Sequence, residues 1–337
     1  MSGRFKVSVI VPVYNTAEYL PECLDSLVGQ SIGLNSIQIV VVDDGSTDSS
    51  PDVVNTYAQR YPENFVCLEQ TNSGQGAARN LALAHCEGEY VGFMDSDDFA
   101  DKDMYRMLYE AAYAADADMC VCGMVSFCDR DGTRGFSRNP QLPANPTTQA
   151  SLFVAPQVQP PIRVVRRSVI VDNGIRFPET RGNEDNGFHF KLAPFCATIA
   201  SVAEPLVKRR LRSGSTVVGV TPFFCEQFFS VVDDAFEFYE EHGLLHDYGE
   251  LLEAGLARML LCSRLGCIGC VADRLQRERL TSKTTEFLDS RFPDRARNRY
   301  LTGALGIYIR HAGPLMVRAA RVPFAARYKR KFNFVGC

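Results

Sequence analysis

The sequence predicts an α/β protein built on a parallel sheet, with a mostly helical region after it. Short apolar runs rich in β-branched residues alternate with segments whose apolar residues recur every three or four positions. Strands that alternate in this way with helices favour a parallel sheet covered by helices on both faces. Of the 337 residues, 46% are hydrophobic and 23% are charged, which is enough to fill a core and excludes a disordered chain.

Four predicted strands lie in the first hundred residues. They are the apolar runs at residues 7–11, 37–42, 65–68 and 90–94. The predicted helices between them cover residues 18–30, 50–61 and 76–84. Ser50 stands before a proline and is expected to cap the second helix, because proline is favoured at the first helical position.

The later part of the chain differs in composition. Residues 129–161 are polar and rich in proline and glycine, so they are predicted to form loops. Residues 223–279 have apolar residues at helical spacing and few breakers, so they are predicted to be helical. From residue 295 onward there are eight Arg, two Lys and no Asp or Glu. This segment has a formal charge of +10, and the rest of the chain carries −14.

Polar side chains follow three of the predicted strands at their carboxyl ends. They are Tyr14 and Asn15 after the first, Asp43 and Asp44 after the second, and Asp95, Ser96 and Asp97 after the fourth. The carboxyl ends of parallel strands meet at one edge of the sheet, which is where ligands bind in open α/β proteins. The sequence therefore predicts a binding site at this edge.

The aspartates suggest two kinds of contact. Asp95 and Asp97 can ligate a hard divalent cation, which proteins usually hold with carboxylates and substrate phosphates. The alternative is a solvated acidic turn that caps the next helix. Asp43 or Asp44 can accept a hydrogen bond from a base or ribose, or else both belong to an Asx-type turn with a helix cap.

A glycine-containing segment, NSGQGAARN at residues 72–80, places Arg79 on the first turn of a predicted helix. A guanidinium beside a helix N-terminus suits a phosphate or a carboxylate. The alternative is that Arg79 pairs with a nearby aspartate. The chain has no dinucleotide fingerprint after its first strand, where PVYN stands, and no P-loop.

In combination, these segments resemble the family 2 glycosyltransferases of GT-A fold, which are inverting enzymes that use nucleotide-diphosphate sugars. The resemblance rests on PVYN at residues 12–15, VVDDGSTD at 41–48, GQGAARN at 74–80 and MDSDD at 94–98. It continues with RFP at 176–178, GNEDNGF at 182–188, EPL at 204–206 and RLRSGS at 210–215. Where the family has aromatic residues before that last segment, this chain has Val207, Lys208 and Arg209.

The resemblance implies a GT-A (Rossmann-like) nucleotide-sugar-binding domain over residues 1–217. Apolar spacing and charge indicate a helical region over 218–294 and a basic amphipathic tail over 295–337. It also implies roles for the residues of the motifs. Pro12 and Tyr14 would contact the nucleotide base, and Asp44 would form a hydrogen bond with it. Asp43 would support the turn. Asn15, Arg79 and Ser96 would lie on the nucleotide side, Asp95 would hold the ribose or sugar, and Asp97 would bind Mn²⁺ or Mg²⁺.

Asp185 matches the catalytic base of the family, which deprotonates the attacking acceptor hydroxyl. The alternative for Asp185 is a helix N-cap, because apolar residues at helical spacing follow it. The implied activity is transfer of a hexose or N-acetylhexosamine from a UDP-sugar to a glycan or lipid-linked acceptor. Synthesis of exopolysaccharide, capsule or cell-wall polymer is the expected setting. The rival hypothesis is a non-catalytic nucleotide-sugar sensor or scaffold.

We expect a cytoplasmic protein. The sequence has no apolar run long enough to span a bilayer, no apparent signal segment, and twelve cysteines scattered singly. The basic tail is either a solvated helix or a peripheral contact with anionic lipid at the inner face of the plasma membrane. Nothing in the sequence supports a nucleic-acid partner. Cys267 and Cys270 could suggest zinc, but packing is the favoured interpretation.

Overall fold

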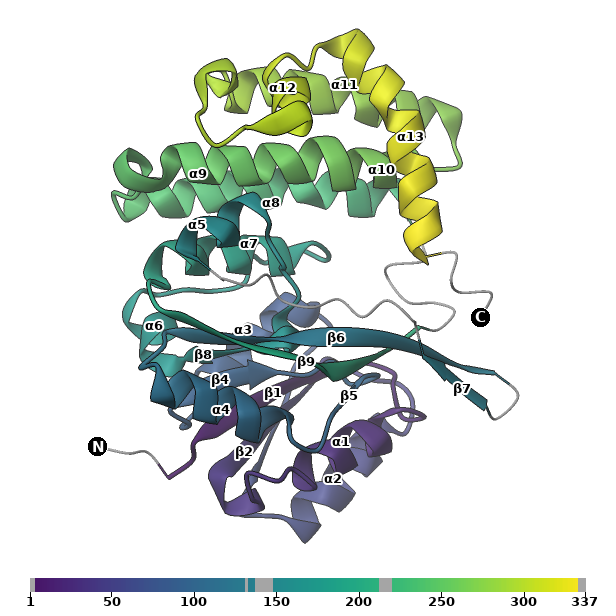
Figure 1. Ribbon diagram of the computed structural model, residues 1–337. Helices are drawn as coiled ribbons and strands as arrows, with labels where there is room; N and C mark the ends of the chain where they lie inside the picture. The colour runs from purple at the N-terminus through teal and green to yellow at the C-terminus, as the bar shows by residue number, and fades with distance from the viewer. Residues whose placement is uncertain (1–3, 131–132, 137–147, 212–219, 333–337) are drawn as a thin grey trace. The chain divides into compact units, whose positions relative to one another are not determined.

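The computed structural model describes residues 4–130, 133–136, 148–211 and 220–332 (Figure 1). The chain divides into two compact units, which we describe separately. The sheet unit comprises residues 1–149 and 157–211, and the helical unit comprises 150–156 and 212–337. The boundary predicted at residue 217 lies outside the described residues. The boundary predicted at residue 295 falls within the helical unit.

One half of the sheet consists of four parallel strands. They are β1 (Val7–Val13), β2 (Ile37–Asp43), β3 (Phe65–Glu69) and β4 (Tyr90–Phe93), in the order β3-β2-β1-β4. Every residue of β1 and β4 is buried, which explains why these strands appear in the sequence as nearly continuous apolar runs. The parallel arrangement predicted for these four strands is confirmed.

The other half of the sheet is mixed rather than parallel. Its strands are β5 (Phe99–Ala100), β6 (Met119–Arg130), β7 (Thr133–Phe136), β8 (Arg163–Arg166) and β9 (Ile199–Arg210). β8 runs antiparallel to β4 and β6, β9 runs parallel to β6, and β5 runs antiparallel to β9. A wholly parallel sheet was therefore wrong as a prediction for this half. Parallel neighbours need crossover connections, and the alternation that predicted them ends after β4.

Helices pack against this sheet. They are α1 (Leu20–Val28), α2 (Ser50–Arg60), α3 (Gln75–Leu83), α4 (Met104–Ala114), α6 (Arg167–Asp172) and α7 (Glu184–Leu192). α3 packs against β1 and β2, and α4 packs against β6, β8 and β9. Ser50 is the first residue of α2, and Ser49 occupies the N-cap position. The Ser50 hydroxyl accepts a hydrogen bond from the Thr16 N–H at 3.0 Å.

The segment predicted as loops, residues 129–161, contains regular structure where it is described. It includes β7, the helix α5 (Gln149–Val154) and a 3₁₀ turn over Pro160–Ile162. Residues 131–132 and 137–147 of that segment lie outside the described residues. The prediction of loops throughout was therefore too broad, because short elements in a proline-rich context give no periodic signal.

The helical unit is formed by successive helices, as predicted for residues 223–279. They are α8 (Pro222–Glu241), α9 (Leu245–Arg258), α10 (Leu265–Ile268), α11 (Arg274–Arg291), α12 (Gly303–Arg310) and α13 (Pro314–Phe332). A π-helical turn over Met259–Arg264 joins α9 to α10, and a 3₁₀ turn over Arg295–Arg297 follows α11. None of the described helices combines the length and apolarity that crossing a membrane requires.

Candidate active site

The predicted site residues of β1, β2 and β4 meet at one edge of the sheet unit. Val13 pairs with Asp43, and the Asp44 N–H donates to the Val13 carbonyl at 2.8 Å. On the other side of β1, the Met94 N–H donates to the Ile10 carbonyl at 2.9 Å. Because β2, β1 and β4 are neighbours, the polar turns that follow them form one continuous rim.

The residues after β1 differ in exposure. Pro12 is buried within β1, in register with Val42, whereas the Tyr14 side chain is 46% exposed and presents an aromatic face. Asn15 has a left-handed backbone and holds the turn after β2. Its Oδ1 accepts from the Thr47 N–H at 2.7 Å, and its own N–H donates to the Ser46 hydroxyl. Asn15 therefore shapes the rim by joining two loops.

Asp43 and Asp44 have distinct surroundings. Asp44 is buried, and its carboxylate accepts three hydrogen bonds from the segment between β3 and α3: from Gln70 Nε2 (2.7 Å), Ser73 N–H (2.7 Å) and Gly74 N–H (2.9 Å). Asp43 is half-buried and accepts only longer contacts from the Ser46 N–H, at 3.3 and 3.4 Å. Asp44 thus anchors a loop, and Asp43 is the more accessible carboxylate of the pair.

Arg79 is the centre of a cluster of carboxylates. It lies on α3, is 1% exposed, and its Nη1 donates to Glu184 Oε1 and to Asp185 Oδ1, both at 3.0 Å. Its Nη2 donates to Asp95 Oδ1 at 2.9 Å and to Gln75 Oε1 at 3.2 Å. We call Arg79, Asp95, Glu184 and Asp185 the Arg79 cluster. The pairing of Arg79 with aspartate, left open by the sequence, is observed, and the guanidinium joins segments about a hundred residues apart.

The Arg79 cluster carries more negative than positive charge, with three carboxylates around one guanidinium. Burial raises the pKa of Asp95, against the opposing effect of Arg79. Burial, followed by repulsion from Glu184, raises the pKa of Asp185 to about 8. Burial acts to lower the pKa of Arg79, but attraction to Asp185, Asp95 and Glu184 outweighs it and the pKa is raised. The cluster therefore favours protons or added cations.

The MDSDD segment forms a tight turn between β4 and β5. The Asp98 N–H donates to the Asp95 carbonyl at 3.0 Å, and the Ser96 hydroxyl, which is buried, accepts from Thr16 Oγ1 at 3.0 Å. Asp98 is buried and accepts from the Arg210 N–H at 2.7 Å. Asp97 is half-buried. The turn leads into β5, so the alternative of an acidic cap on a following helix does not describe it.

Asp185 lies in the first turn of α7, while Asn183 occupies the N-cap position with a φ of 66°. The N-cap alternative for Asp185 is therefore wrong, because its carboxylate is engaged with Arg79 instead of the helix N-terminus. α7 is anchored by Phe188, whose ring stacks on Phe177 with centroids 3.9 Å apart. The Asp185 side chain is 31% exposed and that of Glu184 is 9% exposed. Asp185 is thus the more accessible carboxylate of α7.

Sequence reasoning missed the cations at the end of β9 and the part that Glu184 plays. Arg210 contacts Glu22, donates to the Asp97 carbonyl at 3.1 Å and lies over the Tyr19 ring. The Arg209 guanidinium donates to the Ser126 hydroxyl at 2.8 Å. The sequence signals were the segments RLRSGS and GNEDNGF, which contain Arg210 and Glu184, and the departure from the family pattern at residues 207–209. The following Arg212 and residues 213–215 lie outside the described residues.

The donor set suits a metal ion only in part. Within the described residues, no group of three or more His, Cys, Asp and Glu side chains is arranged to hold a metal ion. The described cysteines therefore form no such group with one another or with histidine, aspartate or glutamate. Asp95 and Asp97 remain compatible with Mn²⁺ or Mg²⁺, because such ions are bound by one or two carboxylates together with substrate phosphates. The surplus negative charge of the Arg79 cluster also favours a cation nearby.

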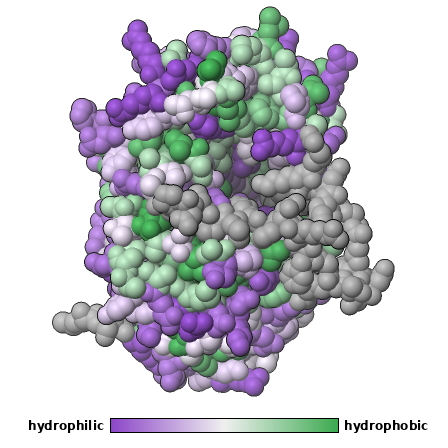
Figure 2. All heavy atoms as spheres, in the orientation of Figure 1, coloured by the Kyte–Doolittle hydropathy of each residue, from purple (hydrophilic) through white to green (hydrophobic). Residues whose placement is uncertain are grey.

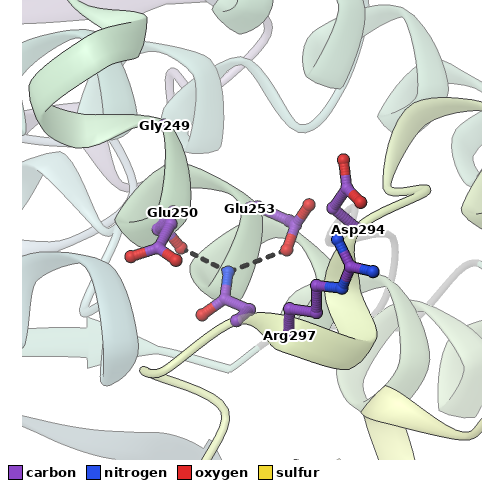
Figure 3. Close-up of a pocket in the computed structure, with 6 residues that line it drawn as sticks. Gly249, Glu250, Glu253, Asp294 and Arg297 are labelled. Atoms are coloured by element: carbon purple, nitrogen blue, oxygen red, sulfur yellow. Dashed lines mark hydrogen bonds between the residues drawn. The ribbon is translucent and has the colours of Figure 1, made fainter.

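The helical unit contains a separate polar hollow of about 310 Å³. Its lining residues are Gly249, Glu250, Glu253, Asp294, Arg297 and Asn298 (Figure 3). Asn298 Nδ2 donates to the Glu250 carbonyl and to Glu253 Oε1, both at 2.7 Å. These bonds fasten the turn after α11 to α9. None of the residues predicted for the site lines this hollow.

Comparison with solved structures identifies the fold. Staphylococcus aureus TarS 1–349, in a structure with UDP-GlcNAc, superimposes with a TM-score of 0.70 at 23% identity, over 96% of this chain and 92% of that one. A mannosyltransferase from Pyrobaculum calidifontis, solved with GDP-Man and Mn²⁺, has a TM-score of 0.52 at 18% identity, over 96% and 88% of the two chains. The predicted GT-A fold with a mostly helical C-terminal region is confirmed.

Sequence comparison points to the same family. Putative glycosyltransferase EpsH of Bacillus subtilis is 28% identical, over 73% of each chain. GlyA of Streptococcus pneumoniae is 41% identical over 38% of this chain and 18% of its own length. A poly(ribitol-phosphate) beta-glucosyltransferase of Bacillus spizizenii is 33% identical over 54% and 28%. Those last two alignments thus cover less than a third of either relative. Residues 8–173 match the model for glycosyl transferase family 2, and through this segment the chain belongs to that family.

Proposed function

We propose that this chain is a metal-dependent inverting glycosyltransferase that moves a hexose or N-acetylhexosamine from a UDP-sugar to a glycan or lipid-linked acceptor. The observation that carries the proposal is the Arg79 cluster. One buried guanidinium holds Asp95, which follows the donor-side strand β4, and Asp185, which begins α7. Fixing a donor-side carboxylate and a candidate base to one rigid group provides the orientation that group transfer requires.

The base of the nucleotide would stack on Tyr14, whose ring is accessible at the end of β1. We assign to Asp43, and not to Asp44, the hydrogen bond with the nucleobase. Asp44 is buried and already accepts three hydrogen bonds, so using it would require opening the loop before α3. Asp43 has only two long contacts to lose. TarS, one of the structural neighbours, was solved with UDP and with UDP-GlcNAc, which supports uridine as the nucleoside.

Asp97 would hold Mn²⁺ or Mg²⁺, with Asp95 beside it and the donor diphosphate completing the ligand set. The chemistry supplied there would be neutralisation of the charge that develops on the departing nucleoside diphosphate. The tight turn fixes the backbone around Asp97, because Asp98 and the Asp97 carbonyl are both bound by Arg210. The Mn²⁺ in the mannosyltransferase structure supports the same class of ion.

Asp185 would accept the proton of the acceptor hydroxyl as that oxygen attacks the anomeric carbon from the face opposite the diphosphate. Arg79 binds its Oδ1, which assigns the proton to Oδ2. Asp185 would contribute removal of the hydroxyl proton. Its raised pKa of about 8 makes it a stronger base than an ordinary aspartate. The names of EpsH and of the ribitol-phosphate glucosyltransferase favour a surface polysaccharide or cell-wall polymer as the acceptor.

The donor site is tested by titrating nucleoside diphosphates into the full chain with and without Mn²⁺. We expect UDP to bind in a metal-dependent way, and Asp97→Asn to remove that dependence. Asp172→Asn is the matched control, since Asp172 is an exposed aspartate at the end of α6. A chain that binds no nucleoside diphosphate with any metal would overturn the donor-site assignment.

The catalytic role is tested separately by release of UDP from a panel of UDP-sugars and acceptors. Asp185→Asn should keep UDP affinity and lower turnover by about 10²–10⁴-fold, the usual contribution of a positioned general base. If the unmodified chain binds UDP-sugars tightly but turns over none of the panel, the sensor or scaffold hypothesis replaces the enzyme.

A further inference from the structure

The helices α12 and α13 expose large apolar side chains. They are Leu305 and Ile307 on α12, and Leu315, Met316 and Val322 on α13. Leu315 is 81% exposed, and Figure 2 shows hydrophobic residues at the surface at the top of the view, where α13 begins. We call the exposed surface of these two helices the α12–α13 face.

The opposite sides of both helices are packed into the helical unit. Ile309, Val317 and Ala325 are buried there. Close backbone approaches fix this orientation. A Cβ on Gly269 would lie 2.6 Å from the Ala325 Cβ, and one on Gly266 would lie 2.8 Å from the Phe324 carbonyl oxygen. Because the packed side of α13 is set by these contacts, rotation cannot bury Leu315 and Val322. The packing of α13 therefore fixes the exposure of these two side chains.

The α12–α13 face is also strongly basic. No Asp or Glu occurs from residue 295 to the end of the sequence. Arg318 and Arg321 share one carboxylate, Glu278 of α11, at 3.9 and 2.8 Å. Arg327 and Lys329 are exposed further along α13. The face therefore carries excess positive charge beside its apolar side chains.

We propose that the α12–α13 face docks on the surface of a lipid bilayer that contains anionic headgroups. Apolar side chains beside arginines suit the boundary between headgroups and acyl chains. The apolar side chains enter the bilayer surface there, and the arginines contact lipid phosphates. Charge complementarity selects this occupant, because the same face of a second copy would bring like charges together. The helices lie on the membrane and do not cross it, in keeping with their composition.

The test is sedimentation of the full chain with vesicles of phosphatidylcholine alone or mixed with phosphatidylglycerol. We expect at least about tenfold tighter binding to the mixed vesicles, since each Lys or Arg near an anionic surface is worth about fivefold. Raising the salt concentration should weaken this binding, because the headgroup attraction is screened. Equal binding to both vesicles, or binding to neither, would overturn the proposal.

Paired variants separate the apolar and the charged contributions. Ile307→Ser combined with Leu315→Ser should weaken vesicle binding at least about tenfold through lost apolar contact. Leu275→Ser is its control, since Leu275 is 80% exposed on α11. Arg327→Gln combined with Lys329→Gln should weaken binding about 25-fold, with Arg60→Gln and Lys102→Gln, exposed on the sheet unit, as its control.

The docking proposal requires that the controls bind as the unmodified chain does, and thermal melts would verify that every variant is folded. Equal losses in the control variants would overturn it by showing that binding is unspecific. Light scattering without lipid tests the rival occupant. Dimers that disappear in the Ile307→Ser, Leu315→Ser variant would assign the face to a second copy and also overturn the proposal.

Discussion

The Arg79 cluster of the sheet unit and the α12–α13 face of the helical unit use unbalanced charge in opposite ways. In the cluster, three carboxylates surround one guanidinium that is 1% exposed, and hydrogen bonds fix every partner. On the face, arginines and lysine outnumber Glu278 and lie in contact with solvent. An imbalance of buried charges shifts pKa values and makes the stability of the fold depend on single charged groups. An imbalance of exposed charges is screened by salt, and its main effect is to attract partners of opposite charge.

The largest effect expected from this contrast is loss of stability when Arg79 is replaced. Arg79→Leu leaves three carboxylates without their shared cation and should lower the free energy of unfolding by about 3–5 kcal/mol. Urea unfolding at pH 8.5 to 9, above the pKa of about 8 of Asp185, is the measurement. Arg79→Lys should recover only part of the loss, because an ammonium cannot bridge several carboxylates as the guanidinium fork does.

Arg106→Leu serves as the control for Arg79→Leu. Arg106 also pairs with two carboxylates, Asp103 and Glu110, but on the surface of α4, where such pairs contribute little. If the two variants unfold at the same urea concentration, the buried cluster is no more important for stability than a surface pair. The expected difference between buried and exposed charges in their contribution to stability would then be absent.

The second prediction concerns pH. Burial and Glu184 raise the pKa of Asp185 to about 8. The base must be ionised to accept a proton, so kcat/KM should rise with pH up to about 8 and then level off. Stability should move the other way. A carboxyl whose pKa is higher in the folded state stabilises the fold at low pH, and this contribution is lost as the pH rises towards 8.

Asp185→Asn provides the check on that pH dependence. It should flatten the pH profile of the residual activity, and it should remove the part of the stability loss between pH 5 and pH 8 that belongs to this carboxyl. A rise in kcat/KM that is complete by pH 5 would show that Asp185 titrates as an ordinary aspartate. The surplus charge of the Arg79 cluster would then have no functional consequence.

How much the sequence reveals differs between the two halves of the sheet. The parallel strands β1, β2 and β4 were predictable because strands buried on both faces are nearly continuous apolar runs. The mixed half was not, since β5 has two residues and β9 combines exposed, half-buried and buried positions without a regular alternation. Their pairing depends on contacts between residues about a hundred positions apart, such as Phe99 with Lys208. No local pattern reports such contacts.

The candidate site shows the same limit at the level of single residues. The motifs located the rim at the ends of β1, β2 and β4, but they did not distinguish Asp43 from Asp44. That difference arises from the fold, which brings the backbone N–H groups of residues 73 and 74 to the Asp44 carboxylate. Likewise, the position of Arg79 on a first helical turn suggested a phosphate. Only the fold brings Glu184 and Asp185 to it.

The smallest predicted effect is on the exposed side of the contrast. Glu278 is the carboxylate that partly neutralises Arg318 and Arg321, and Arg321 lowers its pKa through a hydrogen bond. Glu278→Gln should lower the melting temperature only slightly, because the pair with Arg318 is exposed and Arg321, whose side chain is 15% exposed, keeps its hydrogen bond to Thr281. It should nevertheless strengthen binding to phosphatidylglycerol vesicles by about fivefold, since it adds one net positive charge to the α12–α13 face. Glu286→Gln, at another acidic position of α11, is the matched control. A variant that melts much earlier without binding vesicles more tightly would mean that Glu278 holds the helices together, and that the exposed charges follow the same rule as the buried ones.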